Sequence, residues 1–201
     1  VHVLVNNAGY HSRGDVAEVS ADELARMVDV NLRAPIMLSR IAIPYLVDSG
    51  EGAIINVGSM AGRTPVPGST TYAATKAGLR SFSLALAEEL RDVPVKVGIV
   101  SPGPIATGFI LADIDQTADI TFSQPMSTPE EVAQTVLDLC GNIQREVSMP
   151  RITGFLTTIN YLFPWVGRQM RPWLEKKGAR VKAGLKAEQK RRASGSPGQQ
   201  P

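Results

Sequence analysis

The amino-acid sequence predicts an α/β fold in which a parallel sheet lies between helices. Three short apolar runs, residues 1–5, 53–57 and 95–100, have the length and composition of strands buried on both faces. Segments with apolar residues at helical spacing separate these runs, and such alternation is typical of parallel sheets with helical crossovers. Polar or glycine-containing turns follow the runs, at the edge where open α/β sheets bind ligands.

Composition limits the classes of protein to consider. The chain has 201 residues, of which 43% are hydrophobic and 20% charged, enough for one globular domain with an apolar core. The single cysteine, Cys140, cannot form an internal disulfide, which fits a reducing compartment such as the cytoplasm. No uncharged apolar run is long enough to span a bilayer. His2 and His11 are too isolated to suggest a metal site, so none is expected.

Asn31 is a polar residue inside a predicted amphipathic helix. Ser20 and Glu23 form a capping box that begins this helix, which we expect to run to about residue 47. Pro35 should kink the helix or rearrange it locally, because proline has no N–H to donate. A buried Asn31 would need hydrogen-bond partners. A satisfied structural asparagine and a functional one both fit the sequence.

Ser59, Tyr72 and Lys76 are the candidate catalytic residues. We expect a helix over residues 69–91, on which Tyr72 and Lys76 share one face a turn apart. A cation beside a phenol favours the phenolate, so Lys76 should bring the pKa of Tyr72 towards the working range of an acid or base. Ser59 follows the strand at 53–57 and would present its hydroxyl at the same edge of the sheet. Taken alone, such a tyrosine and lysine would more often belong to a solvated helix face.

Two turns after predicted strands complete the motifs. The residues concerned are Asn6, Asn7, Ala8 and Gly9 after the first strand, and Ser101, Pro102, Gly103, Ile105 and Thr107 at and beyond the end of the third. Gly9 would let a ligand approach the backbone closely. By itself, each turn would be an ordinary connection between elements.

In this order and spacing, the motifs resemble those of the short-chain dehydrogenase/reductase family. The motifs are Asn6-Asn7-Ala8-Gly9, Asn31, Ser59, Tyr72-x-x-x-Lys76 and the Pro102-Gly103 turn. The resemblance covers residues 1–150 and is specific as a set. It departs from the family pattern at Gly58, where members often have a second serine. It implies that residues 1–150 are a partial catalytic domain with a Rossmann-like, doubly wound parallel sheet.

The resemblance also implies an oxidoreductase that uses NAD or NADP to interconvert a carbonyl and a secondary alcohol by hydride transfer. Ser59 would polarise the carbonyl, Tyr72 would donate the proton, and Lys76 would lower the tyrosine pKa and hold the nicotinamide ribose. Asn31 would support the proton route to the lysine. The residues implied to bind the cofactor are Asn6, Asn7, Ala8, Gly9, Tyr72, Lys76, Pro102, Gly103, Ile105 and Thr107.

The sequence begins with Val1 in a predicted strand, whereas complete family members begin with a strand, a Gly-rich turn and a helix. We therefore expect a chain that lacks the first strands and the Gly-rich turn that binds the pyrophosphate. Such a fragment should bind NAD(P) weakly and show little turnover. The residues that decide between NAD and NADP would also lie upstream.

Residues 108–126 show no clear period and occupy the place of a mobile substrate lid in the family. Their apolar side chains favour a lipophilic carbonyl or alcohol as substrate. These side chains are Phe109, Ile110, Leu111 and Ile114. Thr128 and Glu131 form a second capping box, beginning a helix to about residue 140, and Glu146–Met149 is predicted to be a short last strand.

The pattern changes beyond residue 150. Residues 151–181 form a predicted amphipathic helical extension that either packs on its own domain or lies on an anionic membrane surface. Residues 182–201 are predicted to be a disordered basic tail. From residue 164 onward the chain carries ten Lys or Arg against two Glu, a net charge of +8 (ten minus two) within a total of +2. No nucleic-acid-binding module accompanies this charge, so nucleic acid is not an expected partner.

The alternative class of function is a catalytically silent interaction or scaffold protein. Its long helices would serve assembly, and its basic tail would contact a membrane or a partner. Saturable cofactor binding would separate this class from an enzyme. In both classes the family analogy implies a homo-oligomer in the cytoplasm, with peripheral membrane contact left open.

Overall fold

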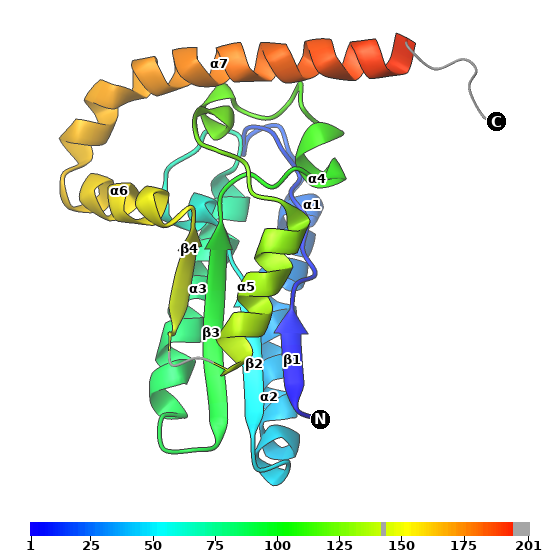
Figure 1. The fold of residues 1–201 in the computed structure, drawn as a ribbon, viewed down its shortest axis with the longest axis vertical. Helices are drawn as coiled ribbons and strands as arrows, with labels where there is room; N and C mark the ends of the chain where they lie inside the picture. The colour runs from blue at the N-terminus through cyan, green and yellow to red at the C-terminus, as the bar shows by residue number, and fades with distance from the viewer. Residues whose placement is uncertain (142–143, 195–201) are drawn as a thin grey trace.

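The computed structural model describes residues 1–141 and 144–194 and confirms an α/β fold with a parallel sheet (Figure 1). The strands of this sheet, in order, are β1 (Val3–Asn6), β2 (Gly52–Val57), β3 (Val95–Pro102) and β4 (Glu146–Met149). Neighbouring strands are parallel, with Asn6 of β1 beside Asn56 of β2. The carboxyl ends of the strands therefore lie at one edge of the sheet.

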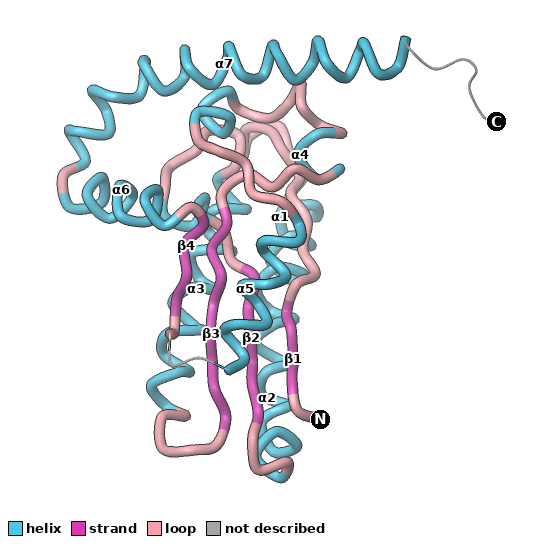
Figure 2. The backbone as a smooth tube through the Cα atoms, in the orientation of Figure 1, coloured by secondary structure: helices cyan, strands magenta, loops and turns pink. Residues whose placement is uncertain are grey.

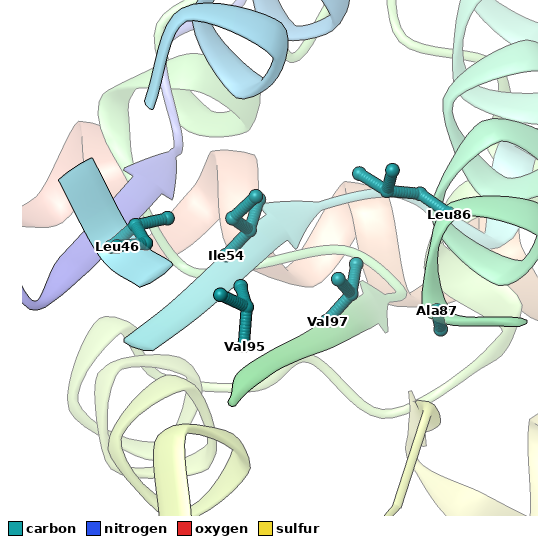
Figure 3. Packing of buried hydrophobic residues seen from close by; sticks show 6 residues of the cluster. All are labelled: Leu46, Ile54, Leu86, Ala87, Val95 and Val97. Atoms are coloured by element: carbon teal, nitrogen blue, oxygen red, sulfur yellow. The ribbon is translucent and has the colours of Figure 1, made fainter. Parts of the chain in front are cut away.

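Helices cover both faces of the sheet, as a doubly wound fold requires (Figure 2). One face carries α2 (Ala34–Asp48) and α3 (Thr70–Glu89), and the other carries α5 (Pro129–Gly141). Successive residues of β2 point to opposite faces. Ile54 packs with Leu46 of α2 and Leu86 of α3 (Figure 3). Its neighbour Ile55 packs with Val132 of α5, so the core has two halves with the sheet between them.

The long helix predicted from residue 20 is divided in the structure. The segments are α1 (Ala21–Val28), a π-helical turn (Asp29–Arg33) and α2, and they follow one another without a loop. The Ser20 hydroxyl caps α1 by accepting a hydrogen bond from the N–H of Glu23 at 3.3 Å. The π-helical turn ends two residues before Pro35, which cannot donate to the carbonyl of Asn31. The widened turn is the local rearrangement expected there, and it contains the buried Asn31.

β1 is less buried than the sequence predicts. Val3 and Val5 are 45% and 43% exposed, so the prediction of a strand buried on both faces is wrong here. Leu4, between them, packs against the core on the α2 and α3 face. The opposite face is covered by α5, which packs on β2 and β3, so Val3 and Val5 keep much of their surface in contact with solvent.

The chain beyond β4 forms two helices, α6 (Arg151–Leu162) and α7 (Pro164–Ser194). The prediction of a disordered tail is wrong for residues 182–194, which continue α7, and residues 195–201 lie outside the described part of the chain. Lys182 helps to explain the order, because its Nζ donates to the backbone carbonyls of Asp115 at 3.2 Å and Thr117 at 2.8 Å. Among the described residues, no helix is long and apolar enough to cross a membrane.

The segment between β3 and α5, where the sequence shows no period, is built on two short helices. They are α4 (Gly108–Leu111) and a 3-10 helix (Asp119–Ser123). Ile110, Ile114 and Phe122 form a small buried cluster. Met126 and Leu185 of α7 pack against this cluster. The C-terminal helix and the segment expected to be a substrate lid are therefore one packed unit.

Gly62 provides a test of the packing between the segment after β2 and helix α3. It lies in a 3-10 helix (Met60–Arg63) that packs on α3, and a Cβ there would lie 2.7 Å from backbone atoms of Lys76 and Ala77. Backbone atoms of a helix cannot move aside easily, so we expect Gly62→Ala to lower the free energy of unfolding by about 1–3 kcal/mol in urea denaturation. Gly108→Ala is the control, since a Cβ there meets nothing within 4 Å. Equal losses in both variants would contradict this account.

Candidate functional site

Most of the predicted site residues line one cavity of about 1050 Å³ at the carboxyl edge of the sheet. Those that line it are Asn7, Gly9, Ser59, Tyr72, Lys76, Pro102, Gly103, Ile105 and Thr107. Asn6 and Asn31 are buried outside the lining, and Ala8 is exposed outside it. The structure therefore gathers both turns and the candidate catalytic residues, and it assigns supporting positions to Asn6 and Asn31.

Ser59, Tyr72 and Lys76 lie together in this cavity. The Ser59 hydroxyl is hydrogen-bonded to Tyr72 and accepts a hydrogen bond from the N–H of Ala61 at 3.1 Å. Lys76 Nζ donates to the carbonyl oxygen of Val57, the last residue of β2, at 2.8 Å. The same ammonium is 5.8 Å from the centre of the Tyr72 ring. A phenol, an alcohol and an ammonium thus face one space, as the sequence predicts.

The pKa of Tyr72 is raised, which differs from the effect expected of Lys76. Burial of the phenol is the main cause, because it disfavours the phenolate; the hydrogen bond with Ser59 and the charge of Arg13 oppose it. Burial also lowers the pKa of Lys76 to about 8, and its ammonium binds a backbone carbonyl instead of the phenol. At neutral pH both side chains therefore hold their protons.

Asn6 connects the first two strands beneath the candidate site. Its Nδ2 donates to Oδ1 of Asn56 at 2.7 Å and to Oγ of Ser39 at 3.3 Å. Asn56 Nδ2 in turn donates to Oγ of Ser83 at 2.8 Å. Because these side chains are buried, their mutual hydrogen bonds avoid the cost of unpaired polar groups. The network fixes β1 and β2 against α2 and α3.

Asn31 holds the turn after β1 in place. Its Oδ1 accepts a hydrogen bond from the N–H of Tyr10 at 3.0 Å, and its Nδ2 donates to the carbonyl of Tyr10 at 2.8 Å. Nδ2 also lies 3.4 Å from the hydroxyl of Thr75. The side chain is fully buried. The sequence left open whether Asn31 is structural or functional, and these contacts favour a structural asparagine that fixes the turn beside the site.

His11 and Arg13 also line the cavity, although the sequence analysis assigned them no role there. The His11 ring stacks on the Tyr72 ring, with centres 4.4 Å apart and planes at 17°. Burial lowers the pKa of His11 to about 4, so this ring is neutral at pH 7. Arg13 forms an ion pair with Asp113 at 2.8 Å. The only signal for either residue was its position just after Gly9, on a loop leaving the carboxyl end of a strand.

The two turns fit the nicotinamide cofactor that the resemblance implies. An added Cβ at Gly9 would lie 3.0 Å from Oδ1 of Asn31 and 3.4 Å from Nζ of Lys76. At Gly103 it would lie 3.2 Å from the side chain of Gln124. Glycine at both positions thus avoids crowding these side chains, and both glycines line the cavity, where backbone groups and the Lys76 ammonium would suit sugar hydroxyls and a carboxamide. No cluster of three or more His, Cys, Asp or Glu able to hold a metal occurs in the described residues.

Comparison with known proteins agrees with the family resemblance of the motifs. Residues 1–118 match a family model described as short chain dehydrogenase. Ketoacyl reductase HetN of Nostoc sp. is 34% identical over 166 residues, covering 79% of this chain and 55% of the relative. The NADP-dependent 3-hydroxy acid dehydrogenase YdfG of Escherichia coli is 34% identical over 143 residues, covering 68% of this chain and 57% of the relative.

Solved structures resemble the chain in the same way. The closed form of a serine dehydrogenase complexed with NADP+ matches with a TM-score of 0.64 and 30% identity, covering 74% of this chain and 64% of that chain. A 4-hydroxyisoleucine dehydrogenase complexed with NADH matches with a TM-score of 0.60 and 25% identity, covering 73% of this chain and 66% of that chain. The chain spans about half the length of the curated relatives it matches.

The buried Lys76 should make stability depend on pH. Burial lowers its pKa from the ordinary 10.5 to about 8, so between these values the unfolded chain binds more protons than the folded one. The penalty for burying the ammonium is present below about pH 8 and disappears as the pH rises towards 10.5. We expect the free energy of unfolding of the wild type to rise across this range relative to Lys76→Met, by at most about 3 kcal/mol.

Urea denaturation at several pH values measures this difference. Lys96→Met is the control for the loss of one positive charge, since the Lys96 side chain is 44% exposed. A wild-type curve that runs parallel to that of Lys76→Met from pH 8 to 10.5 would show that burial does not displace the lysine pKa.

Proposed function

The chain belongs to the short-chain dehydrogenase/reductase family, and we propose that the whole protein interconverts a carbonyl and a secondary alcohol by hydride transfer with NAD or NADP. The observation that carries the proposal is the convergence of Ser59, Tyr72 and Lys76 in one cavity. Relatives named as dehydrogenases and reductases, and a related structure solved with NADP+, support the class of reaction and of cofactor.

The mechanism assigns one task to each side chain. In the reducing direction, Ser59 donates a hydrogen bond to the carbonyl oxygen of the substrate. Tyr72 then donates its proton to that oxygen as the carbon accepts hydride; the phenol holds this proton at neutral pH. Such general acid catalysis contributes about 10²–10⁴-fold. NAD(P), when bound, supplies the hydride.

Lys76 would hold the ribose of the nicotinamide half, because its ammonium faces the cavity one helical turn from Tyr72. Asn7 and Gly9 of the first turn would line the adenosine side. The second turn, with Pro102, Gly103, Ile105 and Thr107, would contact the nicotinamide ring and a phosphate of the cofactor. Asn6 and Asn31 lie outside the lining and would act by holding β1 and the turn after it in position. Ala8 is exposed outside the lining and would contribute only as part of the same turn.

The apolar part of the cavity favours a lipophilic substrate. Residues from the segment after β3 and from α6 and α7 supply this part, including Ile110, Ile120, Leu156, Val166 and Leu174. Of the apolar residues that the sequence placed in the lid, Ile110 lines the cavity, and Ile114 packs with Ile110 in the small buried cluster without reaching the lining. A cavity of about 1050 Å³ has room for a chain or ring system beside the reacting carbonyl.

The alternative, a catalytically silent scaffold, would not need a cavity in which a buried ammonium, a phenol and a hydroxyl converge. Titration of the whole protein with NADPH or NADH, followed by nicotinamide fluorescence, separates the two. A catalytically silent protein would give no saturable change in nicotinamide fluorescence.

Tyr72→Phe tests the catalytic assignment. The substitution removes the proton donor and keeps the ring that stacks on His11, so we expect turnover to fall by about 10²–10⁴-fold with little change in cofactor affinity. Carbonyl-dependent oxidation of NAD(P)H in the whole protein measures it. Tyr45→Phe of α2 is the control; Tyr45 lies outside the cavity lining and the substitution keeps its aromatic ring on the helix surface, so turnover should be unchanged. Near-normal turnover in Tyr72→Phe would remove Tyr72 from the mechanism.

We also propose that the protein is a homo-oligomer that uses the outer face of α2. Met37, Ile41 and Tyr45 are spaced by one helical turn and are 48%, 57% and 59% exposed, so they form an apolar stripe without a covering element in the described chain. We expect Ile41→Lys to convert the oligomer into monomers, as measured by light scattering. An unchanged mass would place the subunit contact elsewhere.

A further inference from the structure

α6 and residues 163–177 form an exposed apolar surface, which we call the outer surface. Phe155, Tyr161 and Leu162 of α6 are 63%, 80% and 63% exposed. Trp165 and Trp173 of α7 are 56% and 60% exposed. A soluble protein rarely exposes so many large apolar side chains on two consecutive helices unless the surface binds something. Figure 1 shows both helices on the side of the molecule where the carboxyl ends of the strands lie.

The outer surface is continuous with the cavity. Ile152, Leu156, Met170 and Trp173 line the cavity that contains Ser59, and they are also between 44% and 62% exposed. The mouth of the cavity is therefore apolar on its outside as well as its inside. A lipophilic molecule that moved along this surface into the cavity would stay in contact with apolar side chains.

The helix α7, which borders this mouth, is basic. α7 carries ten Lys or Arg and two Glu, a net charge of +8 (ten minus two). Arg168 and Lys177 are exposed and line the cavity itself. Long basic side chains can rest their aliphatic parts on an apolar surface while their charges meet anionic headgroups. Tryptophan and tyrosine are the residues that prefer the boundary between water and lipid.

We propose that the outer surface docks peripherally on a bilayer that contains anionic phospholipid, and that the cavity exchanges its lipophilic ligand with that bilayer. The second half of this statement rests on the proposed function, and the first does not. Two copies of the chain meeting through this surface would bring together two segments of net charge +4 (five Lys or Arg minus one Glu in residues 151–177), which disfavours a second copy as the occupant.

Intrinsic tryptophan fluorescence can be used to detect docking. Trp165 and Trp173 are its two tryptophans, and both lie on the outer surface. Transfer of these side chains from water to lipid shifts their fluorescence to shorter wavelength. We expect this shift, together with cosedimentation, when vesicles of phosphatidylcholine with about one-third phosphatidylglycerol are added, and a weaker response with phosphatidylcholine alone.

Phe155→Glu is the test variant, and Leu137→Glu of α5 is its control. The two side chains are 63% and 65% exposed, and both substitutions introduce the same charge. Phe155→Glu should weaken vesicle binding at least about tenfold and Leu137→Glu by less than about twofold, with unchanged circular dichroism in both.

Three results would overturn the proposal: no saturable vesicle binding, equal loss in both variants, or self-association without vesicles that Phe155→Glu abolishes. None of these measurements needs turnover. Vesicle binding without oxidation of NAD(P)H would therefore support the docking surface and contradict the proposed function. Oxidation of NAD(P)H without vesicle binding would support the proposed function and contradict the docking surface.

Discussion

The hydrogen bond from Lys76 Nζ to the carbonyl of Val57 is the interaction on which the site depends. Lys76 is only 5% exposed, so its ammonium has left water and needs a strong acceptor within the protein. The acceptor belongs to the last residue of β2, which fixes α3 against the carboxyl end of the sheet. Tyr72 lies one turn before Lys76 and Ser59 two residues after Val57, so this contact sets the positions of all three reacting groups relative to the cavity.

Strands, helices and the convergence of these groups could be predicted from the sequence because each follows from local pattern. Parallel strands with helical connections end at one edge, and two residues four apart on a helix share a face. His11 and Arg13 could not be placed in this way, since a loop has no period that fixes the direction of a side chain. The pKa of Tyr72 was misjudged for a related reason. Its spacing from Lys76 is local, whereas its burial comes from the whole site and outweighs the nearby charge.

The C-terminal helix shows where composition is a poor guide to order. The composition of residues 182–201, basic and then rich in Ser, Gly, Pro and Gln, predicts disorder because such a segment lacks the apolar residues to fold alone. In the structure Lys182 meets two backbone carbonyls and the carboxylate of Asp119, and Leu185 enters the small core beneath the cavity. Residues with high helix propensity need only a few such contacts to remain helical.

These contacts also join the outside of the molecule to the inside of the cavity. Lys182 binds the same segment from which Asp113 reaches Arg13, and Arg13 acts electrostatically on Tyr72. α7 is therefore hydrogen-bonded to the segment between β3 and α5, and Asp113 of that segment is ion-paired with Arg13. The same helix also lines the cavity directly through Arg168, Trp173 and Lys177. The helix that carries most of the positive charge and the segment that lines the cavity are consequently parts of the same packed unit.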